Sequence, residues 1–323
     1  MKRLSNAYDK IISINNLTLA HKNACKGKSR QKGVITYKKN LRANIEALHL
    51  NLKACEYKTP IYKIFTIYEP KEREIYVLPY EDRIVQHAIL QVIGEMFRKN
   101  FTKNTYSCIP KRGIHLAKNN LQKFMRDKEA SKYCLKIDIV KFYPSVDLDI
   151  LTIMLRRKIK DEKLLKLLDV IIRSAVGLPI GNFLSQYLGN FYLSPFDHWL
   201  KEEMKVKFCA RYCDDTVILS DSKEYLHDLL EKIKAYLWEN LRLVVKINHQ
   251  VFPVSARGID FLGYKTYHEY TLIRPSIKVN CAKMMKYNPN EASIASYKGW
   301  FKHANCINLL RKLFGNETKS ETQ

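Results

Sequence analysis

The chain has 323 residues, of which 46% are hydrophobic, enough for a sizeable core and for more than one compact unit. Lysine and arginine number 56 against 32 aspartates and glutamates, which gives a formal net charge of +24. So large an excess favours a polyanionic partner. Because the charge is spread along the chain, it favours a long nucleic acid over an anionic membrane surface or a targeting peptide.

Neither a membrane anchor nor a secretion signal is indicated. No apolar run is long enough to span a bilayer, and the N-terminal segment lacks the apolar core of a signal peptide. The eight cysteines form no CxxC pair and no zinc spacing, so we expect free thiols. We therefore predict a soluble, cytoplasmic protein without a membrane partner.

Hydrophobic periodicity predicts helices and strands that alternate irregularly. Residues 1–30 mix short apolar stretches with a basic run, and two interpretations stay open: a partly ordered, solvated arm, or an extension that binds RNA or a partner. The elements expected downstream are a helix over 37–55, strands within 62–79, helices over 80–99 and 115–130, a strand over 133–139, a helix over 147–174 with Ser145 or Asp147 as N-cap, a helix from Phe183 that Pro195 kinks or ends, a hairpin of 207–212 and 216–220, a helix over 223–240, short strands through 275 and a helical region over 291–314. Such interleaving without βαβ regularity indicates the α+β class.

Three aspartates stand at the ends of predicted strands. Asp138 ends the apolar strand in YCLKIDIVKFYPSVD, and Asp214 and Asp215 lie at the hairpin turn in RYCDDTVIL. Joining a nucleotide to a growing strand needs in-line attack of a hydroxyl on phosphorus, assisted by two Mg²⁺ ions that carboxylates hold. An acid pair alone is an ordinary turn feature. The apolar frame and the third acid are what point to polymerase chemistry.

Segments in a fixed order resemble the motifs of reverse transcriptases. They are 73–90 (REIYVLPYEDRIVQHAIL) and 106–113 (YSCIPKRG), similar to the fingers of bacterial enzymes related to group II introns, then 134–147 for the first palm motif, 177–186 (GLPIGNFLSQ) for the next, 212–215 (YCDD) for the YxDD box and 257–264 (RGIDFLGY) for the primer grip. The resemblance implies a right-hand polymerase fold: an N-terminal basic extension over 1–55, fingers over 56–132, a palm over 133–265 with part of the fingers interleaved, and the primer-grip end and thumb over 266–323.

The resemblance also implies a role for each matched residue. Asp138 and Asp214 would hold two Mg²⁺ ions, with Mn²⁺ as an alternative in vitro, Asp215 would lie close by, and the carbonyl of Ile139 would complete one metal shell. The other implied roles are a steric gate at Tyr143, a triphosphate clamp at Lys71 and Arg73, nucleotide contact at Ile180 and Gly181, and a primer seat at Phe261, Leu262, Gly263 and Tyr264. Alternatives stay open, because Tyr143 also suits a core and Lys71 and Arg73 also suit a solvated strand. Lys246 and His249 are alternative proton donors to pyrophosphate.

One departure from the common pattern narrows the subtype. Most reverse transcriptases have Gln-Gly in the middle palm motif, where this chain has Ile180 and Gly181, followed by Ser185 and Gln186. This pattern, with 297–304 (YKGWFKHA), resembles the enzymes of diversity-generating retroelements. The resemblance implies errors at template adenines, and as partners a template RNA, a cDNA or DNA primer, deoxynucleotide triphosphates and a small basic accessory protein. Group II-like, retron and phage-defence enzymes, and a non-catalytic RNA-binding protein with a polymerase fold, are the alternatives.

Overall fold

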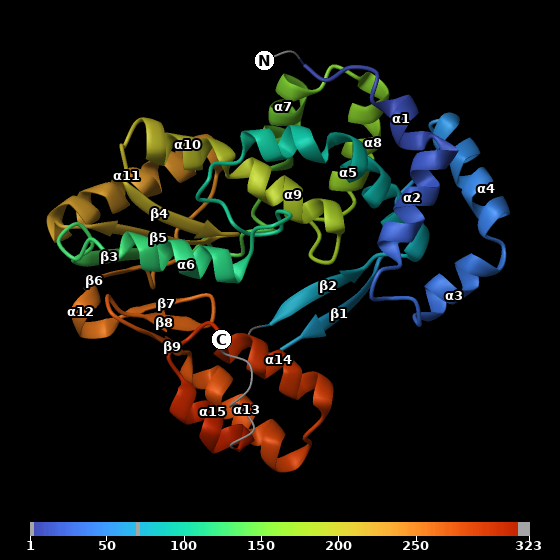
Figure 1. The fold of residues 1–323 in the computed structure, drawn as a ribbon. Coiled ribbons are helices and arrows are strands. Elements are labelled where there is room, and N and C mark those ends of the chain that lie inside the picture. The colour runs from blue at the N-terminus through green and yellow to red at the C-terminus, as the bar shows by residue number, and fades with distance from the viewer. Residues whose placement is uncertain (1–2, 69–71, 316–323) are drawn as a thin grey trace. The chain divides into compact units, whose positions relative to one another are not determined.

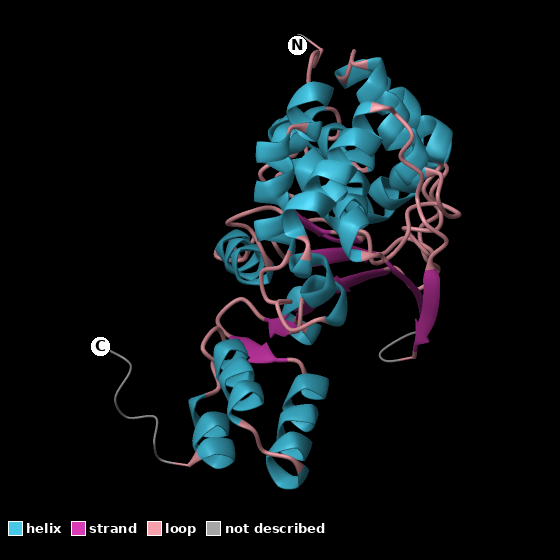
Figure 2. Cartoon of the chain, turned by 90° about the vertical axis from the view of Figure 1, so that its right-hand side faces the viewer, coloured by secondary structure: helices cyan, strands magenta, loops and turns pink. Residues whose placement is uncertain are grey.

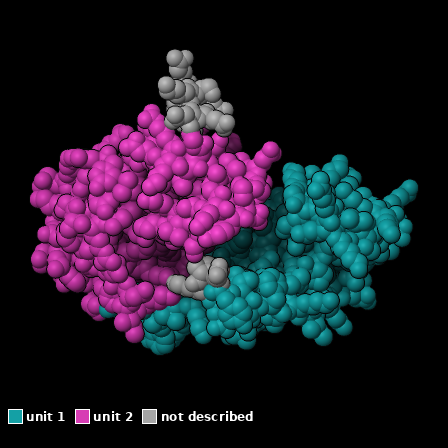
Figure 3. All heavy atoms as spheres, turned by 90° about the horizontal axis from the view of Figure 1, so that it is seen from below, with its two compact units in different colours: residues 1–103, 139–203, 234–245 teal, residues 104–138, 204–233, 246–323 magenta. Residues whose placement is uncertain are grey.

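The structure is a computed structural model that describes residues 3–68 and 72–315, so Lys71 lies outside the described residues. The chain forms two compact units (Figure 3). The first comprises residues 1–103, 139–203 and 234–245, and the second comprises 104–138, 204–233 and 246–323. Among the described residues no helix is both long and apolar enough to cross a membrane. All eight cysteines are free, as predicted.

The first unit is mainly helical (Figure 1). Its elements are α1 (Tyr8–Ile12), α2 (Ile14–Ala24), α3 (Lys32–Lys39), α4 (Leu41–Lys53), the hairpin of β1 (Lys63–Ile67) and β2 (Arg73–Val77), α5 (Tyr80–Asn100), α7 (Leu148–Lys158), α8 (Glu162–Ile172), α9 (Phe183–Tyr192) and α10 (Ser194–Glu202). Helix α5 is its centre, because Ile84, Ala88 and Ile93 are fully buried and both α2 and α9 pack against it. The amide oxygen of buried Gln86 accepts a hydrogen bond from the N–H of Leu184, which anchors the start of α9.

Part of the N-terminal segment is packed, so its interpretation as a solvated arm is wrong for α2, whereas residues 26–32 of the basic run are exposed. Leu17 and Ala20 of α2 are fully buried. The side-chain amide of Asn16 donates to the carbonyl of Ala88, and Gln91 donates to the side-chain oxygen of Asn16 at 2.8 Å. These contacts join α2 to α5, so the first helices belong to the core of the unit.

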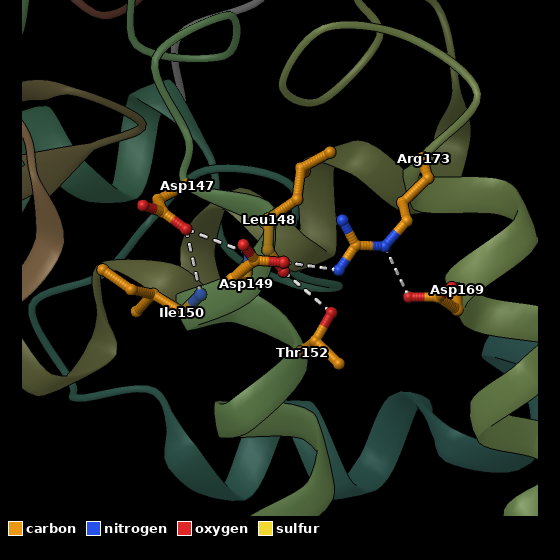
Figure 4. Close-up of polar contacts among 7 residues, drawn as sticks. All are labelled: Asp147, Leu148, Asp149, Ile150, Thr152, Asp169 and Arg173. Atoms are coloured by element: carbon orange, nitrogen blue, oxygen red, sulfur yellow. Dashed lines mark hydrogen bonds and ion pairs between the residues drawn. The ribbon is translucent and has the colours of Figure 1, made fainter.

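The helix expected over 147–174 is two helices, α7 and α8. Asp147 is the N-cap of α7, and its Oδ1 accepts from the N–H groups of Asp149 and Ile150 at 2.9 and 3.0 Å (Figure 4). Asp161 caps α8 in the same way. Arg173 joins the pair by contacting Asp149 on α7 and Asp169 on α8 (Figure 4). The break arises because Asp161 offers a second N-cap, which competes with continuing the helix.

The second unit contains two antiparallel sheets. Its elements are α6 (Ile114–Phe124), β3 (Tyr133–Ile137), β4 (Phe208–Tyr212), β5 (Asp215–Ser220), β6 (Gln250–Pro253), α12 (Val254–Arg257), β7 (Ile259–Phe261), β8 (Tyr264–Thr266), β9 (Thr271–Ile273), α13 (Pro275–Tyr287), α14 (Glu291–Phe301) and α15 (Ile307–Phe314). The four-stranded sheet has the order β4-β5-β3-β6, and the three-stranded sheet has the order β7-β8-β9. Helix α6 buries Ala117 and Leu121 against the larger sheet. Helix α11 (Lys223–Leu241) runs through both units.

The C-terminal helices differ most from expectation. Helix α13 was not predicted, and the helical region over 291–314 is divided into α14 and α15, which Figure 2 shows with α13 as a small bundle beside short strands. Pro195 lies in the first turn of α10, where its missing N–H has no helical partner to lose. The helix expected over 115–130 ends at Phe124. Helices and antiparallel strands together confirm the α+β class.

Candidate active site

The register of the larger sheet brings the three aspartates to one end of it. Ile137 at the end of β3 pairs with Thr216 of β5, and Tyr212 of β4 pairs with Asp215. Continuing the antiparallel register by one residue places Asp138 opposite Asp215. Asp214 lies in the two-residue loop between β4 and β5. Asp215 therefore begins a strand, although the sequence suggested that it lies within the turn.

The turn at residues 212–215, which we call the catalytic turn after its predicted role, has an unusual backbone that neighbouring side chains support. Cys213 has φ of +55°, as the first loop residue of a type II′ hairpin requires. The guanidinium of Arg211 donates to the carbonyl of Cys213 at 2.6 Å, and the N–H of Cys213 donates to the hydroxyl of Ser107 at 3.0 Å. Arg211 is only 1% exposed. A φ of this kind costs a non-glycine residue about 1 kcal/mol or more, so such supports are needed.

Neither Arg211 nor Ser107 was predicted as a site residue. The signal for Arg211 was present in the sequence, because an arginine inside an apolar strand must find hydrogen-bond partners when it is buried. Ser107 gave no local signal. Its contact arises because the segment around Thr105 pairs with Arg211 of β4.

The carboxylates crowd one another. Burial, a hydrogen bond with Asp138 and repulsion from Asp138 raise the pKa of Asp214 to about 7. Burial raises the pKa of Asp215 to about 6, against the lowering effect of Lys136, while Asp138 raises it further. The Nζ atom of Lys136 lies 3.6 Å from Oδ2 of Asp215. A cation bound between these carboxylates would favour their charged forms and lower these pKa values again.

The donor set fits divalent cations that prefer hard oxygen ligands. Oδ1 of Asp215 is buried and makes no hydrogen bond to the described residues. In the described part of the chain no three acidic, cysteine or histidine side chains already converge into a metal site. Lysines supply positive charge at two of these acids: Oδ2 of Asp138 lies 2.5 Å from the Nζ atom of Lys246, and Lys136 lies beside Asp215.

The two alternative proton donors are placed differently. The Nζ atom of Lys246 contacts the carboxylate of Asp138, and the backbone N–H of Lys246 donates to the backbone carbonyl of Asp138 at 2.8 Å. The Nδ1 atom of His249 lies 2.9 Å from the carbonyl of Lys246. Lys246 is therefore the one of the two that touches a predicted catalytic acid.

The predicted nucleotide-binding residues of the first unit form a second group. The N–H of Leu178 donates to the carbonyl of Tyr143, and the N–H of Tyr76 donates to the carbonyl of Ile180, both at 2.8 Å. Gly181 has φ of +120°, and a Cβ atom there would lie 2.3 Å from the carbonyl oxygen of Tyr76. The main chain at 177–181 therefore lies against β2. Arg73 begins β2 and is exposed, and Ile139 is buried.

The predicted primer grip is the hairpin of β7 and β8. Phe261 pairs with Tyr264, and the loop residues Leu262 and Gly263 have φ of +52° and +84°, which defines a type I′ turn. Phe261 and Tyr264 are buried. A Cβ atom on Gly263 would lie 2.5 Å from the ring of Trp300, so only glycine fits here.

The fold and the arrangement of the three acids are typical of template-directed polymerases. A family model described as reverse transcriptase (RNA-dependent DNA polymerase) matches residues 68–266. Because this match covers more than half of the chain, the chain belongs to the reverse transcriptase family, which confirms the family that the motifs indicated. Membership implies metal-dependent catalysis, and a template RNA and DNA as the family's substrates.

Known relatives are distant. Protein YkfC of Escherichia coli is 23% identical over 249 residues, covering 62% of this chain and 65% of the relative. A putative COX1/OXI3 intron 2 protein of Saccharomyces cerevisiae is 20% identical over 253 residues, covering 57% of this chain and 29% of the relative. The chain thus spans less than two thirds of either relative.

Solved structures support the fold. Telomerase from Candida albicans, in complex with a fragment of telomeric RNA, matches 81% of this chain and 55% of its own chain, with a TM-score of 0.54 and 12% identity. Apo telomerase from Candida tropicalis matches 80% of this chain and 55% of its own, with the same score and identity. The right-hand polymerase fold is therefore confirmed.

Proposed function

We propose that the chain is an RNA-directed DNA polymerase that extends a primer with deoxynucleotides at Asp138, Asp214 and Asp215. The observation that carries the proposal is the sheet register, which sets Asp138 at the end of β3 beside the hairpin that carries the other two acids. Rigid strands suit this chemistry, because positioning supplies much of the rate of phosphoryl transfer.

Each residue of the site has a separate proposed role. Asp138 and Asp214 would hold the metal ions, and Arg211 and Ser107 keep the catalytic turn in place. Bound Mg²⁺ would lower the pKa of the primer hydroxyl and neutralise the charge of the leaving pyrophosphate. Lys246, next to Asp138, is the candidate proton donor to that pyrophosphate.

Primer extension on an RNA template tests the proposal. The purified chain, a primed RNA, deoxynucleotides and Mg²⁺ should give DNA of template length. Tight RNA binding without any product would instead identify a non-catalytic RNA-binding protein.

A cavity in the first unit supports RNA binding. It has a volume of about 580 Å³ and its lining includes Lys32, Lys63 and Arg83. The helices α3 and α5 begin at its wall, and neither N-terminus has a side-chain cap. The Nη1 atom of Arg83 has no hydrogen-bond partner among the described residues. Three basic residues in the lining, a guanidinium nitrogen without a partner among the described residues and two helix N-termini without side-chain caps together favour phosphate.

Removing the two lysines of this cavity should weaken RNA binding in a salt-dependent way. For Lys32→Gln/Lys63→Gln, the slope of log affinity against log salt should fall by about 0.7 for each lost phosphate contact with single-stranded RNA. Fluorescence anisotropy with a labelled RNA measures this slope. The matched control is Lys163→Gln/Lys166→Gln on the exposed face of α8, which removes the same charge. Equal slopes for both variants would refute the phosphate contact.

We further propose that the enzyme belongs to a diversity-generating retroelement and makes errors at template adenines, with a small basic accessory protein as partner. The support is Ile180, which stands where a glutamine is usual and cannot hydrogen-bond through its side chain. One hydrogen bond contributes about 0.5–1.5 kcal/mol, so its loss relaxes base discrimination by up to about tenfold.

Ile180→Gln should therefore reduce errors at template adenines by up to about tenfold. Sequencing of cDNA made from a defined, adenine-bearing RNA measures the error spectrum. Ile180→Leu, which stays apolar, serves as the control and should keep the wild-type spectrum. An unchanged spectrum in Ile180→Gln would exclude this role for Ile180.

A group II-like intron enzyme is the second candidate. The yeast relative, named an intron protein, favours it. Ile180 and Gln186 argue against it, because intron enzymes have Gln-Gly and Ser-Pro at the corresponding places. The same cDNA experiment separates the two, because an intron-type enzyme should show no excess of errors at adenines.

A further inference from the structure

A cluster of aromatic and basic side chains joins three elements of the second unit: helix α6, the hairpin of β7 and β8, and the end of helix α14. The ring of His115 on α6 stacks on the ring of His303, with centroids 3.8 Å apart and an interplanar angle of 25°. The Nδ1 atom of His115 lies 3.3 Å from the hydroxyl of Tyr264, which donates to the carbonyl of Trp300 at 3.1 Å. We call His115, Tyr264, Trp300 and His303 the grip junction.

The grip junction reaches the tip of the primer-grip hairpin. The ring of Trp300 covers Gly263 so closely that no Cβ atom would fit there. Tyr264, directly after it, is fully buried. Helix α6 thus contacts the hairpin at Tyr264 through His115, and helix α14 contacts it at Gly263 through Trp300. Movement of either helix would move the tip.

We propose that His115 is a positioning residue for polymerisation, which fixes the primer-grip hairpin against helix α14 through Tyr264 and so presents the primer end in one position. The inference rests on the proposed polymerase function and on the primer-grip role of the hairpin. His115 does not need to touch the primer, because it acts through Tyr264. Positioning of this kind affects turnover more than nucleotide binding.

The surroundings of the junction favour the uncharged form of both histidines. Burial, and then Lys118, lowers the pKa of His115, while burial followed by His115, Lys118 and Lys302 lowers the pKa of His303. Lys118 comes from α6, is 6% exposed and lies 5.9 Å from the centre of the Tyr264 ring. The other titratable groups facing the pair are Tyr264 and, beside Tyr264, Cys306. Protonating either histidine would add positive charge next to Lys118.

The pKa of each histidine is lower in the folded state than its ordinary value of 6.5. Above that pH the folded junction has its full stability. As the pH falls below 6.5, the unfolded state binds protons more readily than the folded state, so this stability is lost. The grip junction should therefore loosen in mild acid. Burial and Asp138 also raise the pKa of Asp214 and of Asp215, so only the ratio of variant to wild-type turnover isolates the junction.

Two substitutions separate the hydrogen bond from the ring stack. His115→Phe keeps a ring against His303 but loses the contact to the Tyr264 hydroxyl. His115→Asn loses the ring but carries a polar atom at the position of Nδ1. His227→Asn on the exposed face of α11 is the matched control, because it removes a histidine of the same unit away from the junction.

The experiment measures kcat and the KM for deoxynucleotide on a primed RNA at about pH 7.5 and pH 5.5, together with RNA affinity. His115→Phe should lower kcat about tenfold and leave KM and RNA affinity within about twofold, and His115→Asn should restore most of the loss. At the lower pH the turnover of His115→Asn relative to wild type should rise, whereas that of His227→Asn should stay constant.

Unchanged kcat in His115→Phe, or equal damage to kcat, KM and RNA affinity, would overturn the proposal, as would a ratio for His115→Asn that does not change with pH. If the wild-type enzyme is active in those cases, the proposed polymerase function is not contradicted. A wild-type chain without any polymerase activity would instead refute the proposed function, and the inference with it.

Discussion

Asp214→Asn is expected to reduce primer extension about a thousandfold while leaving RNA affinity unchanged. An amide has no charge and offers one oxygen, so it is a poor ligand for Mg²⁺. The fold should not suffer, because burial and Asp138 already raise the pKa of Asp214 to about 7, and a neutral side chain relieves that repulsion. The variant should therefore unfold at the same temperature as the wild type or higher. Single-turnover primer extension and a thermal melt measure the two quantities.

Asp228→Asn is the matched control for this prediction. Asp228 lies on the exposed face of helix α11, so the same chemical change should leave extension near the wild-type rate. If Asp214→Asn kept activity within tenfold of the wild type, the assignment of this acid as a metal ligand would be wrong. Loss of activity together with a lower melting temperature would mean that the effect comes from the fold instead.

The sequence predicts the centre of the site well because its signals are local. Apolar runs on both sides of Asp214 and Asp215 require a hairpin, and the apolar strand before Asp138 requires a strand end. These features depend on residues within about ten positions along the chain. The structure has strands at all three places, with Asp215 moved from the turn into β5.

What supports the site could not be predicted in this way, because it depends on contacts between distant segments. Ser107 reaches Cys213 only because two segments about a hundred residues apart pair side by side. Helix α13 is a different case, because it was missed although Ile277, Cys281, Met284 and Met285 recur at helical spacing and pack together in the C-terminal cluster. The packing of the N-terminal helices depends on Asn16 and Gln91, whose polar side chains look solvated in the sequence alone.

Gly181→Ala is the second substitution with a large expected effect. The φ of Gly181 is +120°, which an alanine rarely adopts, and the new Cβ atom would lie 2.3 Å from the carbonyl oxygen of Tyr76. That oxygen belongs to β2 and cannot move alone, because the N–H of Tyr76 donates to the carbonyl of Ile180. We expect the free energy of unfolding to fall by about 3 kcal/mol through strain and overpacking together. The midpoint of urea unfolding, followed by circular dichroism, measures it.

Gly299→Ala is the matched control, because we expect it to raise the free energy of unfolding instead of lowering it. Gly299 lies within helix α14, and no heavy atom lies within 4 Å of the position of its Cβ. The same added methyl group should therefore stabilise the chain by about 0.5–1 kcal/mol, because alanine loses less backbone entropy than glycine on entering a helix. If the two variants shifted the urea midpoint in the same direction, the contact between 177–181 and β2 would not be the reason for glycine at 181. If only Gly181→Ala lowered it, the KM for deoxynucleotide should rise as well, since the neighbouring Ile180 is the proposed nucleotide contact.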